Sequence, residues 1–473
     1  MGKAWVKRWS PEKKGVKGSF VEILEIKPTT SIEEIQWRLP PSKSHAIRLL
    51  ALAGQSEQSI LLRGMEHAGD DVVAMRRCLR QMGVSCSDVG PGGEVLPSDP
   101  NLDDQPPEGT VAWRIEGVGP QGLHPPVSVL HAGNSGTTLR ILMALASRFS
   151  VPIMLDGDAS LRSRKYPVML DSLEKMAVVC SHGAAGEGLP LLIQGPAMHP
   201  ATLELEATIS SQPFTAWHLA TPSFSSGMAL SMAGEPVSRR HLALTRDLCV
   251  LAGAAVSVHE SMLEPWVPSF EHPEITVPSD CSMFAFACLA ANVCKTNVKV
   301  SNMPSNVDSL GHEVLFTYAP SLGLALKNGL IQPNASPSSL VADLRDANDL
   351  ITPLAAMLAL GGGGEITGVA HAAHKETNRL TGTKLFLQQF GLDVQLSEGA
   401  LHIEGGQTLV SPKELVQTYG DHRMQMTAIV LSMGCSDTVR IEGSRLHRVA
   451  DPMAVKRWRS QGVSIEEVLH QHW

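Results

Sequence analysis

Six stretches of the chain share one design, and this design strongly limits how the chain can fold. Each begins with small, polar or turn residues and passes into a run rich in alanine, leucine and methionine that is long enough for about three to four helical turns. The stretches are LPPSKSHAIRLLALAG (39–54), GNSGTTLRILMALAS (133–147), SSQPFTAWHLATPS (210–223), SDCSMFAFACLAANV (279–293), ANDLITPLAAMLAL (347–360) and GDHRMQMTAIVLSMG (420–434). A helix that is apolar nearly all round is buried. The sequence therefore predicts six buried helices, each opened by a turn of the N-cap type.

The spacing of these stretches indicates a repeated unit. With Ser42, Asn134, Ser210, Asp280, Asp349 and Asp421 as markers, the successive gaps are 92, 76, 70, 69 and 72 residues. A unit of about 70 residues can hold two helices and three or four strands of ordinary length. Short β-like runs such as TLELEAT and TVRIEG lie between the markers, and amphipathic helices are predicted over 70–84 and 379–394. We therefore expect an α/β fold built of six units.

Chain length divides the six units between two domains. A chain of 473 residues is too long for one hydrophobic core, so three units per domain are expected. Apolar residues make up 43% of the chain and charged residues 18%, a composition that can bury sizeable cores. We expect the crossing between the domains near EPWVPSFEHPEI (264–275), which is rich in proline, lies between the third and fourth units and has no helical period.

Charge and cysteine content exclude several classes of protein. A net charge of −8 argues against broad nucleic-acid binding, which requires a basic surface. The eight cysteines form no C-x-x-C pair, and most lie in apolar runs, which predicts reduced, buried thiols in a cytoplasmic protein and no metal cluster. No run of 18 apolar residues occurs, so no membrane span is expected. The basic segment MGKAWVKRWSPEKKG lacks the apolar core of a signal peptide.

Cations gather at the polar turns of this acidic chain. The turns and two neighbouring clusters carry Lys43, Arg48, Arg140, Arg162, Arg164, Lys375, Arg379 and Arg423. Arginine forms bidentate contacts with carboxylates and phosphates, and helix N-termini add to the attraction. If the helix starts converge, they form a pocket for a small, multiply anionic ligand, with Asp349 and Glu376 as acid/base candidates. The alternative is a set of ordinary N-caps and separate surface salt bridges, each of which contributes little.

Six motifs occur in one order along the chain. They are S-K-S-x-x-x-R (42–48), G-N-S-G-T (133–137), S-S-Q (210–212), N-D (348–349), K-E-T-x-R (375–379) and D-H-R-M-x-M (421–426). Together they resemble the enolpyruvyl transferase family over about residues 39–458. The resemblance implies two domains, each made of three βαβαββ-type units, with the active site in the inter-domain cleft. It assigns 41–272 to the first domain and 20–40 plus 273–473 to the second.

The resemblance also implies a reaction. The enolpyruvyl (carboxyvinyl) group of phosphoenolpyruvate passes to the 5-hydroxyl of shikimate 3-phosphate, giving 5-enolpyruvylshikimate 3-phosphate and phosphate in chorismate and aromatic amino acid biosynthesis. The members of the family that use this acceptor need no metal or organic cofactor. They bind small molecules rather than nucleic acid or membranes, and we expect a cytoplasmic monomer.

Site residues follow from the motifs position by position. The resemblance implies catalytic roles for Lys43, Asp349 and Glu376: Lys43 contacts both reacting groups, Asp349 holds the attacking hydroxyl, and Glu376 moves a proton at the methylene carbon. The implied substrate ligands are Ser44, Arg48, Asn134, Gly136, Thr137, Arg140, Arg164, Ser210, Ser211, Gln212, Ser238, Lys375, Arg379, Arg423 and Arg448. Of these, Arg140, Arg379 and Arg423 match ligands of phosphoenolpyruvate, whereas Ser210, Ser211 and Ser238 match ligands of the phosphate of the shikimate substrate.

Two departures from the family pattern concern the site. His241 stands where the family has a tyrosine of the shikimate pocket, and Arg448 stands near the position of a C-terminal lysine that contacts phosphoenolpyruvate. Three alternatives are also considered, one of which, an RNA-end-processing relative, would be expected to show a nucleotidylated histidine and a basic face. A UDP-N-acetylglucosamine enolpyruvyl transferase would carry K-N at the first motif and usually a reactive cysteine in the loop after the arginine-rich region; here the motif is K-S and no cysteine lies between Val151 and Val179. A non-catalytic anion-binding relative would not need the two acids.

Overall fold

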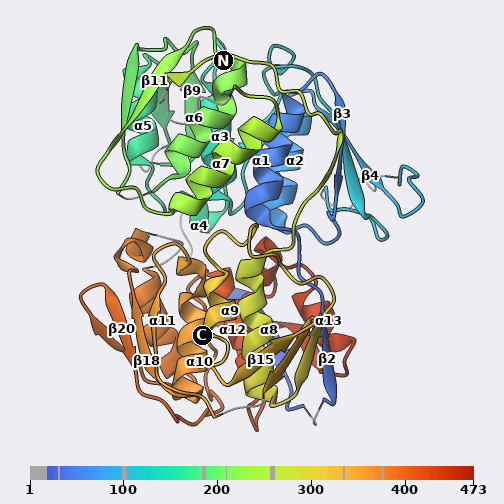
Figure 1. Cartoon of the computed structure of the whole chain (residues 1–473), viewed down its shortest axis with the longest axis vertical. Helices are drawn as coiled ribbons and strands as arrows, with labels where there is room; N and C mark the ends of the chain where they lie inside the picture. Colours follow the sequence, from blue (N-terminus) through green and yellow to red (C-terminus); the bar gives the residue numbers. More distant parts are fainter. Residues whose placement is uncertain are drawn as a thin grey trace, which may run out of the picture.

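The computed structural model describes residues 19–29, 32–97, 104–183, 188–208, 210–255, 262–333, 336–374 and 378–472. These residues form two bodies, one above the other in Figure 1, and each body has its own hydrophobic core. The core of the first body contains residues from Ala46 to Val277. The core of the second contains residues from Leu24 to Leu39 and from Met283 to Ile465.

Three sheets and seven α-helices make up the described part of the first body. The helices are α1 (Lys43–Gly54), α2 (Asp70–Gln81), α3 (Gly136–Ala146), α4 (Ala159–Arg162), α5 (Pro167–Lys175), α6 (Gln212–Ala220) and α7 (Arg239–Leu251). One sheet has the order β13 (Glu274–Thr276), β3 (Ser59–Arg63), β5 (Ala112–Glu116), β4 (Ser85–Val89). The next has the order β6 (Leu130–His131), β7 (Ile153–Asp156), β9 (Leu191–Gln194), β8 (Val179–His182), and the last has the order β10 (Thr202–Glu206), β11 (Met228–Ala233), β12 (Met262–Leu263).

The described part of the second body repeats this plan. Its helices are α8 (Cys281–Cys294), α9 (Val314–Tyr318), α10 (Ile351–Leu360), α11 (Arg379–Gln388), α12 (His422–Ser432) and α13 (Ala454–Arg459). Two sheets have the orders β15 (Leu324–Lys327), β16 (Leu330–Pro333), β14 (Asn297–Val300), β2 (Glu34–Trp37) and β17 (Leu340–Asp343), β18 (Gly364–Thr367), β20 (Ala400–Ile403), β19 (Gln395–Ser397). The third has the order β21 (Val439–Glu442), β1 (Ser19–Ile26), β22 (Ile465–His472).

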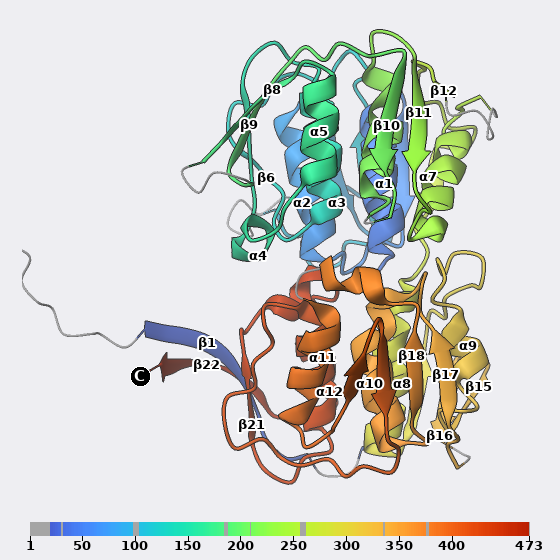
Figure 2. The same ribbon diagram turned by 90° about the vertical axis from the view of Figure 1, so that its left-hand side faces the viewer.

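The pairing of strands is the same in five of the six sheets. Each contains one parallel pair, such as β3 with β13, β6 with β7 or β17 with β18, and continues with antiparallel neighbours. In β6–β7, β10–β11 and β17–β18 a crossover through a helix joins the parallel pair, whereas the parallel partners β3–β13 and β2–β14 come from distant parts of the chain. The sheet that contains β1 differs, because all of its pairs are antiparallel. In Figure 2 the outer parts of β1 and β22 extend beyond the second body as a two-stranded ribbon.

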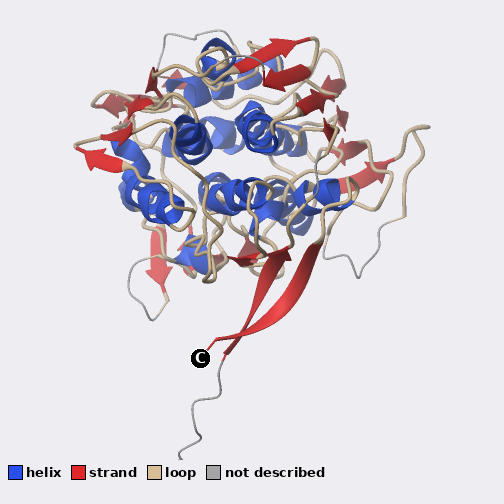
Figure 3. Ribbon diagram, turned by 90° about the horizontal axis from the view of Figure 1, so that it is seen from below, coloured by secondary structure: helices blue, strands red, loops and turns tan. Residues whose placement is uncertain are grey.

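Helices fill the interior and strands lie outside them, as the view from below in Figure 3 shows. The three predicted buried helices of each body contact one another: α1, α3 and α6 in the first body, and α8, α10 and α12 in the second. Their side chains are almost completely inaccessible to solvent, for example Leu50, Leu142 and Phe284, each 0% exposed. The prediction of six buried helices is therefore confirmed. No helix in the described part of the chain is both long and apolar enough to cross a membrane.

Three of the six turns that open these helices are ordinary N-caps. The side chains of Ser135, Asp280 and Asp421 accept a backbone N–H of their own helix, as predicted. Ser42 accepts none from the described residues, because its hydroxyl lies 2.9 Å from His45 Nδ1. Asp349 lies in a 3-10 turn, η3 (Asn348–Leu350), ahead of α10, and so does not occupy the cap position.

The chain crosses between the bodies at two adjacent places. Pro41 forms a bridge with Ser279, Ser42 N–H donates to Pro278 O at 2.7 Å, and Asp280 N–H donates to Pro40 O at 2.9 Å. The second crossing follows β13, which pairs in parallel with β3 of the first body. The boundary predicted at 272–273 would place β13 in the other domain. We therefore propose the boundary at 277–280 and keep 20–40 as part of the second domain.

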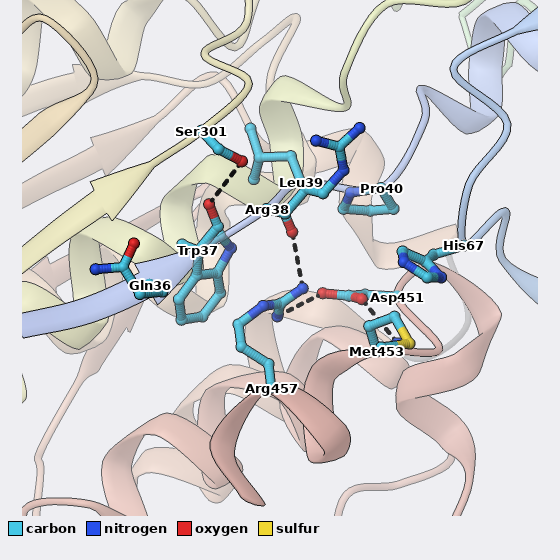
Figure 4. Close-up of a pocket in the computed structure, with 10 residues that line it drawn as sticks. All are labelled: Gln36, Trp37, Arg38, Leu39, Pro40, His67, Ser301, Asp451, Met453 and Arg457. Atoms are coloured by element: carbon cyan, nitrogen blue, oxygen red, sulfur yellow. Dashed lines mark hydrogen bonds and ion pairs between the residues drawn. The ribbon is translucent and has the colours of Figure 1, made fainter. Parts of the chain in front are cut away.

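The first crossing segment packs against helix α13, as Figure 4 shows. The Arg457 guanidinium lies 4.4 Å from the centre of the Trp37 ring and donates to Arg38 O at 2.8 Å, while Asp451 accepts from Arg457 Nη1 at 2.8 Å. A cavity of about 230 Å³ opens between these residues and His67. The charges of Arg457 and Asp451 neutralise each other. This buried ion pair therefore gives the cavity no net charge that would attract a charged ligand.

Candidate functional site

A cavity of about 570 Å³ lies between the two bodies. The first body lines it with residues at the starts of α1, α3, α6 and α7, and the second body with His312, Asp346, Asn348, Asp349, His371, Asn378 and His422. A smaller cavity adjoins it and shares Lys43, Ser44, His241, His312 and Asp349 with it, adding Arg423. Helix N-termini present unpaired N–H groups and a partial positive charge. Their convergence creates a site suited to an anionic ligand.

Most of the predicted site residues line this space. Those that border the larger cavity are Lys43, Ser44, Arg48, Asn134, Gly136, Thr137, Arg140, Arg164, Ser210, Ser211, Gln212, Ser238 and Asp349. Arg423 borders the smaller cavity, and Arg379 lies directly behind Asp349. Arg448 is absent from both sets of described lining residues. Lys375 and Glu376 lie outside the described residues. These placements leave the individual roles as predictions.

Lys43, the first residue of α1, has an acidic partner that the sequence did not identify. Its Nζ lies 3.0 Å from Asp71 Oδ2, and the side chain of Asp71 is 4% exposed. Asp71 stands in the first turn of α2, 28 residues away along the chain. A carboxylate in the first turn of a helix is common for electrostatic reasons alone. The sequence therefore offered no signal that Asp71 would border the cavity beside Lys43.

Arg140 and Arg164 form a cationic group at the start of α3. Arg140 donates to Gly136 O at 2.9 Å and to Gln212 Oε1, and Arg164 donates to Asn134 Oδ1 at 2.8 Å. Burial lowers the pKa of Arg140 to about 10, so its guanidinium remains charged at neutral pH. A Cβ at Gly136 would lie 3.0 Å from an Arg140 nitrogen, so a larger residue there would crowd the guanidinium.

Arg48 borders the cavity but is almost completely buried. It is 2% exposed, and burial lowers its pKa to about 10. Its guanidinium donates to Thr245 Oγ1 at 2.9 Å, Thr215 Oγ1 at 3.2 Å and Ser44 O at 2.8 Å. Arg48 therefore links α1 with α6 and α7 and contributes positive charge to the cavity wall.

Two buried arginines of the second body share one carboxylate. Arg379 Nη1 lies 2.6 Å from Asp349 Oδ1, and Arg423 Nη2 lies 3.3 Å from Asp349 Oδ2. Asp421, which is 0% exposed, accepts from Arg379 Nε at 3.2 Å and caps α12 through Arg423 N–H at 2.8 Å. The Arg423 guanidinium also donates to Ser282 Oγ at 2.9 Å. Asp349 is thus the carboxylate of this cluster that faces the cavity, whereas Asp421 supports the arginines from behind.

Histidines add to the cavity wall. His241, which the family pattern places in the shikimate pocket, lines the cavity as expected. His371, His312 and His422 line the same space, and the sequence arguments did not assign them. His371 lies near Asn348, with Nε2 3.0 Å from the side-chain amide nitrogen. The sequence could have pointed to His422 as a site residue, because His422 lies inside the D-H-R motif. No motif marks an isolated histidine such as His371.

Arg448 lies at the edge of the interface between the bodies. Its guanidinium lies 3.6 Å from Asp70 Oδ1, and the side chains are 30% and 38% exposed. The turn that carries it, η5 (Leu446–Val449), approaches Gly69 so closely that a Cβ there would lie 2.5 Å from Val449 O. Asp70 immediately precedes Asp71, the partner of Lys43. Arg448 is therefore near the cavity but is bound to an acidic residue of α2.

The thiols near the site are poor nucleophiles. Cys281 lines the smaller cavity, where burial raises its pKa to about 12. A thiolate rather than a thiol is the reactive form, so Cys281 is protonated and unreactive at neutral pH. All eight cysteines are described and free. Among the described residues, no group of three or more His, Cys, Asp or Glu side chains is arranged to hold a metal ion.

Comparisons with known proteins agree with this geometry. The family model described as EPSP synthase (3-phosphoshikimate 1-carboxyvinyltransferase) matches residues 26–452. The chain is 28% identical over 430 residues to the 3-phosphoshikimate 1-carboxyvinyltransferase of Korarchaeum cryptofilum, a match covering 89% of this chain and 94% of that protein. It is 26% identical over 408 residues to the protein of that name from Methanothermobacter thermautotrophicus, covering 85% of this chain and 90% of the other.

A solved structure extends the comparison to the fold. The structure of EPSP synthase from Acinetobacter baumannii superposes with a TM-score of 0.69 at 21% identity and covers 95% of this chain and 100% of that one. The predicted two-domain α/β fold class is confirmed by this similarity together with the family match. The chain therefore belongs to the EPSP synthase (3-phosphoshikimate 1-carboxyvinyltransferase) family.

Proposed function

We propose that this chain transfers the enolpyruvyl group of phosphoenolpyruvate to the 5-hydroxyl of shikimate 3-phosphate, giving 5-enolpyruvylshikimate 3-phosphate and phosphate. One observation carries the proposal: basic and hydroxyl side chains from four of the six motifs, together with Asp349 from a fifth, border one space between the bodies although the motifs lie far apart in the sequence. Separate surface salt bridges would not converge in this way. Membership of the family supplies the identity of the two substrates.

The charge distribution fits two anionic substrates. In our proposal Arg140, Arg379 and Arg423 bind the carboxylate and phosphate of phosphoenolpyruvate, because guanidinium groups form bidentate hydrogen bonds with both. Ser210, Ser211 and Ser238, at the starts of α6 and α7, bind the phosphate of the shikimate substrate. Backbone N–H groups at these helix starts strengthen the binding.

Proton transfers define the roles of the acidic groups. The 5-hydroxyl loses its proton as its oxygen bonds to C2 of phosphoenolpyruvate, while C3 gains a proton. Loss of a proton from C3 then restores the double bond as the bond from C2 to the phosphate oxygen breaks and phosphate leaves. Asp349 is proposed as the carboxylate that holds and deprotonates the hydroxyl, with Lys43 positioned by Asp71. Proton transfer at C3 by Glu376, which lies outside the described residues, remains a prediction.

Phosphate release tests the proposal. Purified protein with phosphoenolpyruvate should release phosphate when shikimate 3-phosphate is added, and the rate should persist in EDTA because the proposed reaction needs no metal. UDP-N-acetylglucosamine should not replace the acceptor, since the first motif reads K-S rather than K-N and no cysteine lies between Val151 and Val179. Release that depends on UDP-N-acetylglucosamine instead would refute the assignment. Binding of both substrates without any turnover would favour a non-catalytic relative.

We further propose that the protein acts as a monomer in the cytoplasm on these small molecules. Eight free thiols support a reducing compartment, because disulfides are typical of oxidising ones. Sedimentation of the purified protein would test the monomeric state.

A further inference from the structure

A buried tyrosine ring lies against one of the arginines of the cavity. Tyr166 is 3% exposed and belongs to the hydrophobic core of the first body. The centre of its ring lies 5.0 Å from Cζ of Arg140, which is within the range of a cation–π contact. Arg140 lines the cavity, as do Lys165 and Pro167 on either side of the tyrosine, but Tyr166 is absent from the described lining residues. An effect of the ring on a ligand therefore passes through Arg140.

The ring of Tyr166 is held in one orientation by contacts of its own. Its hydroxyl donates to Leu161 O, in helix α4. Burial raises the pKa of this hydroxyl to about 12, so it stays protonated and keeps donating at neutral pH. The backbone of Tyr166 is the N-cap of α5, and Pro167, which has a fixed φ, begins that helix. The ring is therefore anchored at both ends of its side chain.

The position of Arg140 is unfavourable for a cation. Its guanidinium donates to the carbonyl of Gly136, the first residue of α3, and so lies at the end of that helix that carries a partial positive charge. Burial lowers the pKa of Arg140 to about 10, and the like charge of Arg164 acts in the same direction. The electron-rich face of an aromatic ring attracts a guanidinium group. The Tyr166 ring therefore offsets part of the cost of keeping this cation in the cavity wall.

We propose that Tyr166 is a positioning residue for Arg140: its ring holds the guanidinium at the start of α3, beside Gln212, in the orientation that binds phosphoenolpyruvate. This inference rests on the proposed function for the identity of the ligand, whereas the ring contact belongs to the chain alone. A guanidinium that is already oriented loses less conformational freedom when an anion binds. Tyr166 therefore acts on the affinity for phosphoenolpyruvate and leaves the proton transfers to other residues.

Two substitutions separate this role from a structural one. Tyr166→Leu removes the ring, whereas Tyr166→Phe keeps the ring and loses only the hydrogen bond to Leu161 O. The KM for phosphoenolpyruvate should rise about three- to tenfold in Tyr166→Leu, which corresponds to about 0.7–1.4 kcal/mol and matches the size of such a contact. It should stay within about twofold of the wild type in Tyr166→Phe, and kcat should change by less than about twofold in both. Both variants should lose stability in urea, so stability alone does not distinguish them.

A second aromatic pair in the same body provides the matched control. Cζ of Arg148 lies 5.3 Å from the centre of the Phe149 ring, and neither residue is among the described residues that line the cavity. Phe149→Leu should therefore lose stability without a change in the KM for phosphoenolpyruvate. A double-mutant cycle tests the route of the effect. In an Arg140→Ala background, Tyr166→Leu should change this KM by less than about twofold, because the group that the ring positions is absent.

Nuclear magnetic resonance reads the position of Arg140 without any ligand. An aromatic ring shifts the resonances of protons over its face upfield, so the Nε–H proton of Arg140 should lie upfield in the wild type and Tyr166→Phe relative to Tyr166→Leu; Arg140→Ala identifies the signal. Equal shifts in all three proteins, an unchanged KM in Tyr166→Leu, or an equal rise of KM in Tyr166→Phe would overturn the proposal. A wild-type protein that releases no phosphate with both substrates would instead contradict the proposed function, and the resonance would then decide the positioning of Arg140 by itself.

Discussion

Replacing Asp349 by asparagine should separate catalysis from substrate binding. The side chain of Asp349 lies between Arg379 and Arg423, at 2.6 Å and 3.3 Å, and is 30% exposed toward the cavity. Asparagine has nearly the same shape but cannot accept a proton at the pH of the reaction. The substitution therefore removes the proposed base while leaving both arginines in place.

The expected magnitude follows from these contacts. A general base contributes about 10²–10⁴-fold to the rate, which corresponds to about 3–5 kcal/mol in the activation barrier. We expect kcat to fall by this factor. The KM for phosphoenolpyruvate should stay the same or decrease, because two buried guanidinium groups lose an anion that competes with the substrate for them.

Asp421→Asn is a matched control for this experiment. Asp421 also contacts Arg379, at 3.2 Å, but it is 0% exposed and borders neither described cavity. Asparagine can still cap α12. Breaking one side of a buried ion pair costs at most about 3–5 kcal/mol, so this variant should lose stability in urea but keep most of its kcat.

Steady-state kinetics of phosphate release, together with urea unfolding, compare the two variants. The reasoning is wrong if Asp349→Asn keeps its turnover within tenfold of the wild type, or if both variants lose turnover equally. A rise in KM at constant kcat for Asp349→Asn would show that this carboxylate serves binding alone.

Three further predictions concern charge, acidity and thiols. Arg140→Lys should raise the KM for phosphoenolpyruvate about tenfold or more, since a hydrogen bond to a charged group contributes about 1.5–3 kcal/mol; an unchanged KM in the kinetic assay would contradict this. Burial lowers the pKa values of His45, His218 and His447 to about 4, so the folded protein binds fewer protons than the unfolded chain between about pH 6.5 and 4. The free energy of unfolding should therefore fall as the pH drops through this window, by up to about 1.4 kcal/mol per pH unit for each histidine, and urea titrations at pH 7 and 5 should show a smaller difference in His218→Gln. Cys281 and the other buried thiols should react slowly with a disulfide reagent at pH 8 in the folded protein and quickly in urea; rapid labelling of the native protein would count against the buried positions.

The buried helices could be predicted because their signal is local. A run such as that of α8 is apolar on every side, so it must be buried wherever the chain places it. The polar turns ahead of these runs were equally visible in the sequence, and the structure brings those of α1, α3, α6, α10 and α12 to one cavity. The exact boundary between the bodies was harder to predict from the sequence, because β13 joins the first body by pairing with β3, which lies more than 200 residues earlier in the chain. Pairing between strands so far apart in the chain produces no local sequence pattern.

The sequence by itself determined which residues could carry the chemistry, because residue type and order define the motifs around Lys43, Arg140 and Asp349. Tertiary structure decided what each of them touches. Lys43 faces Asp71 and Asp346 reaches α7 because helices and loops from different units end at the same cleft. Arg448, whose role as a substrate ligand stays a prediction, lies 3.6 Å from Asp70 Oδ1 of α2. The physical reason is that an ion pair acts over a few ångströms in space, whatever the separation of its partners along the chain.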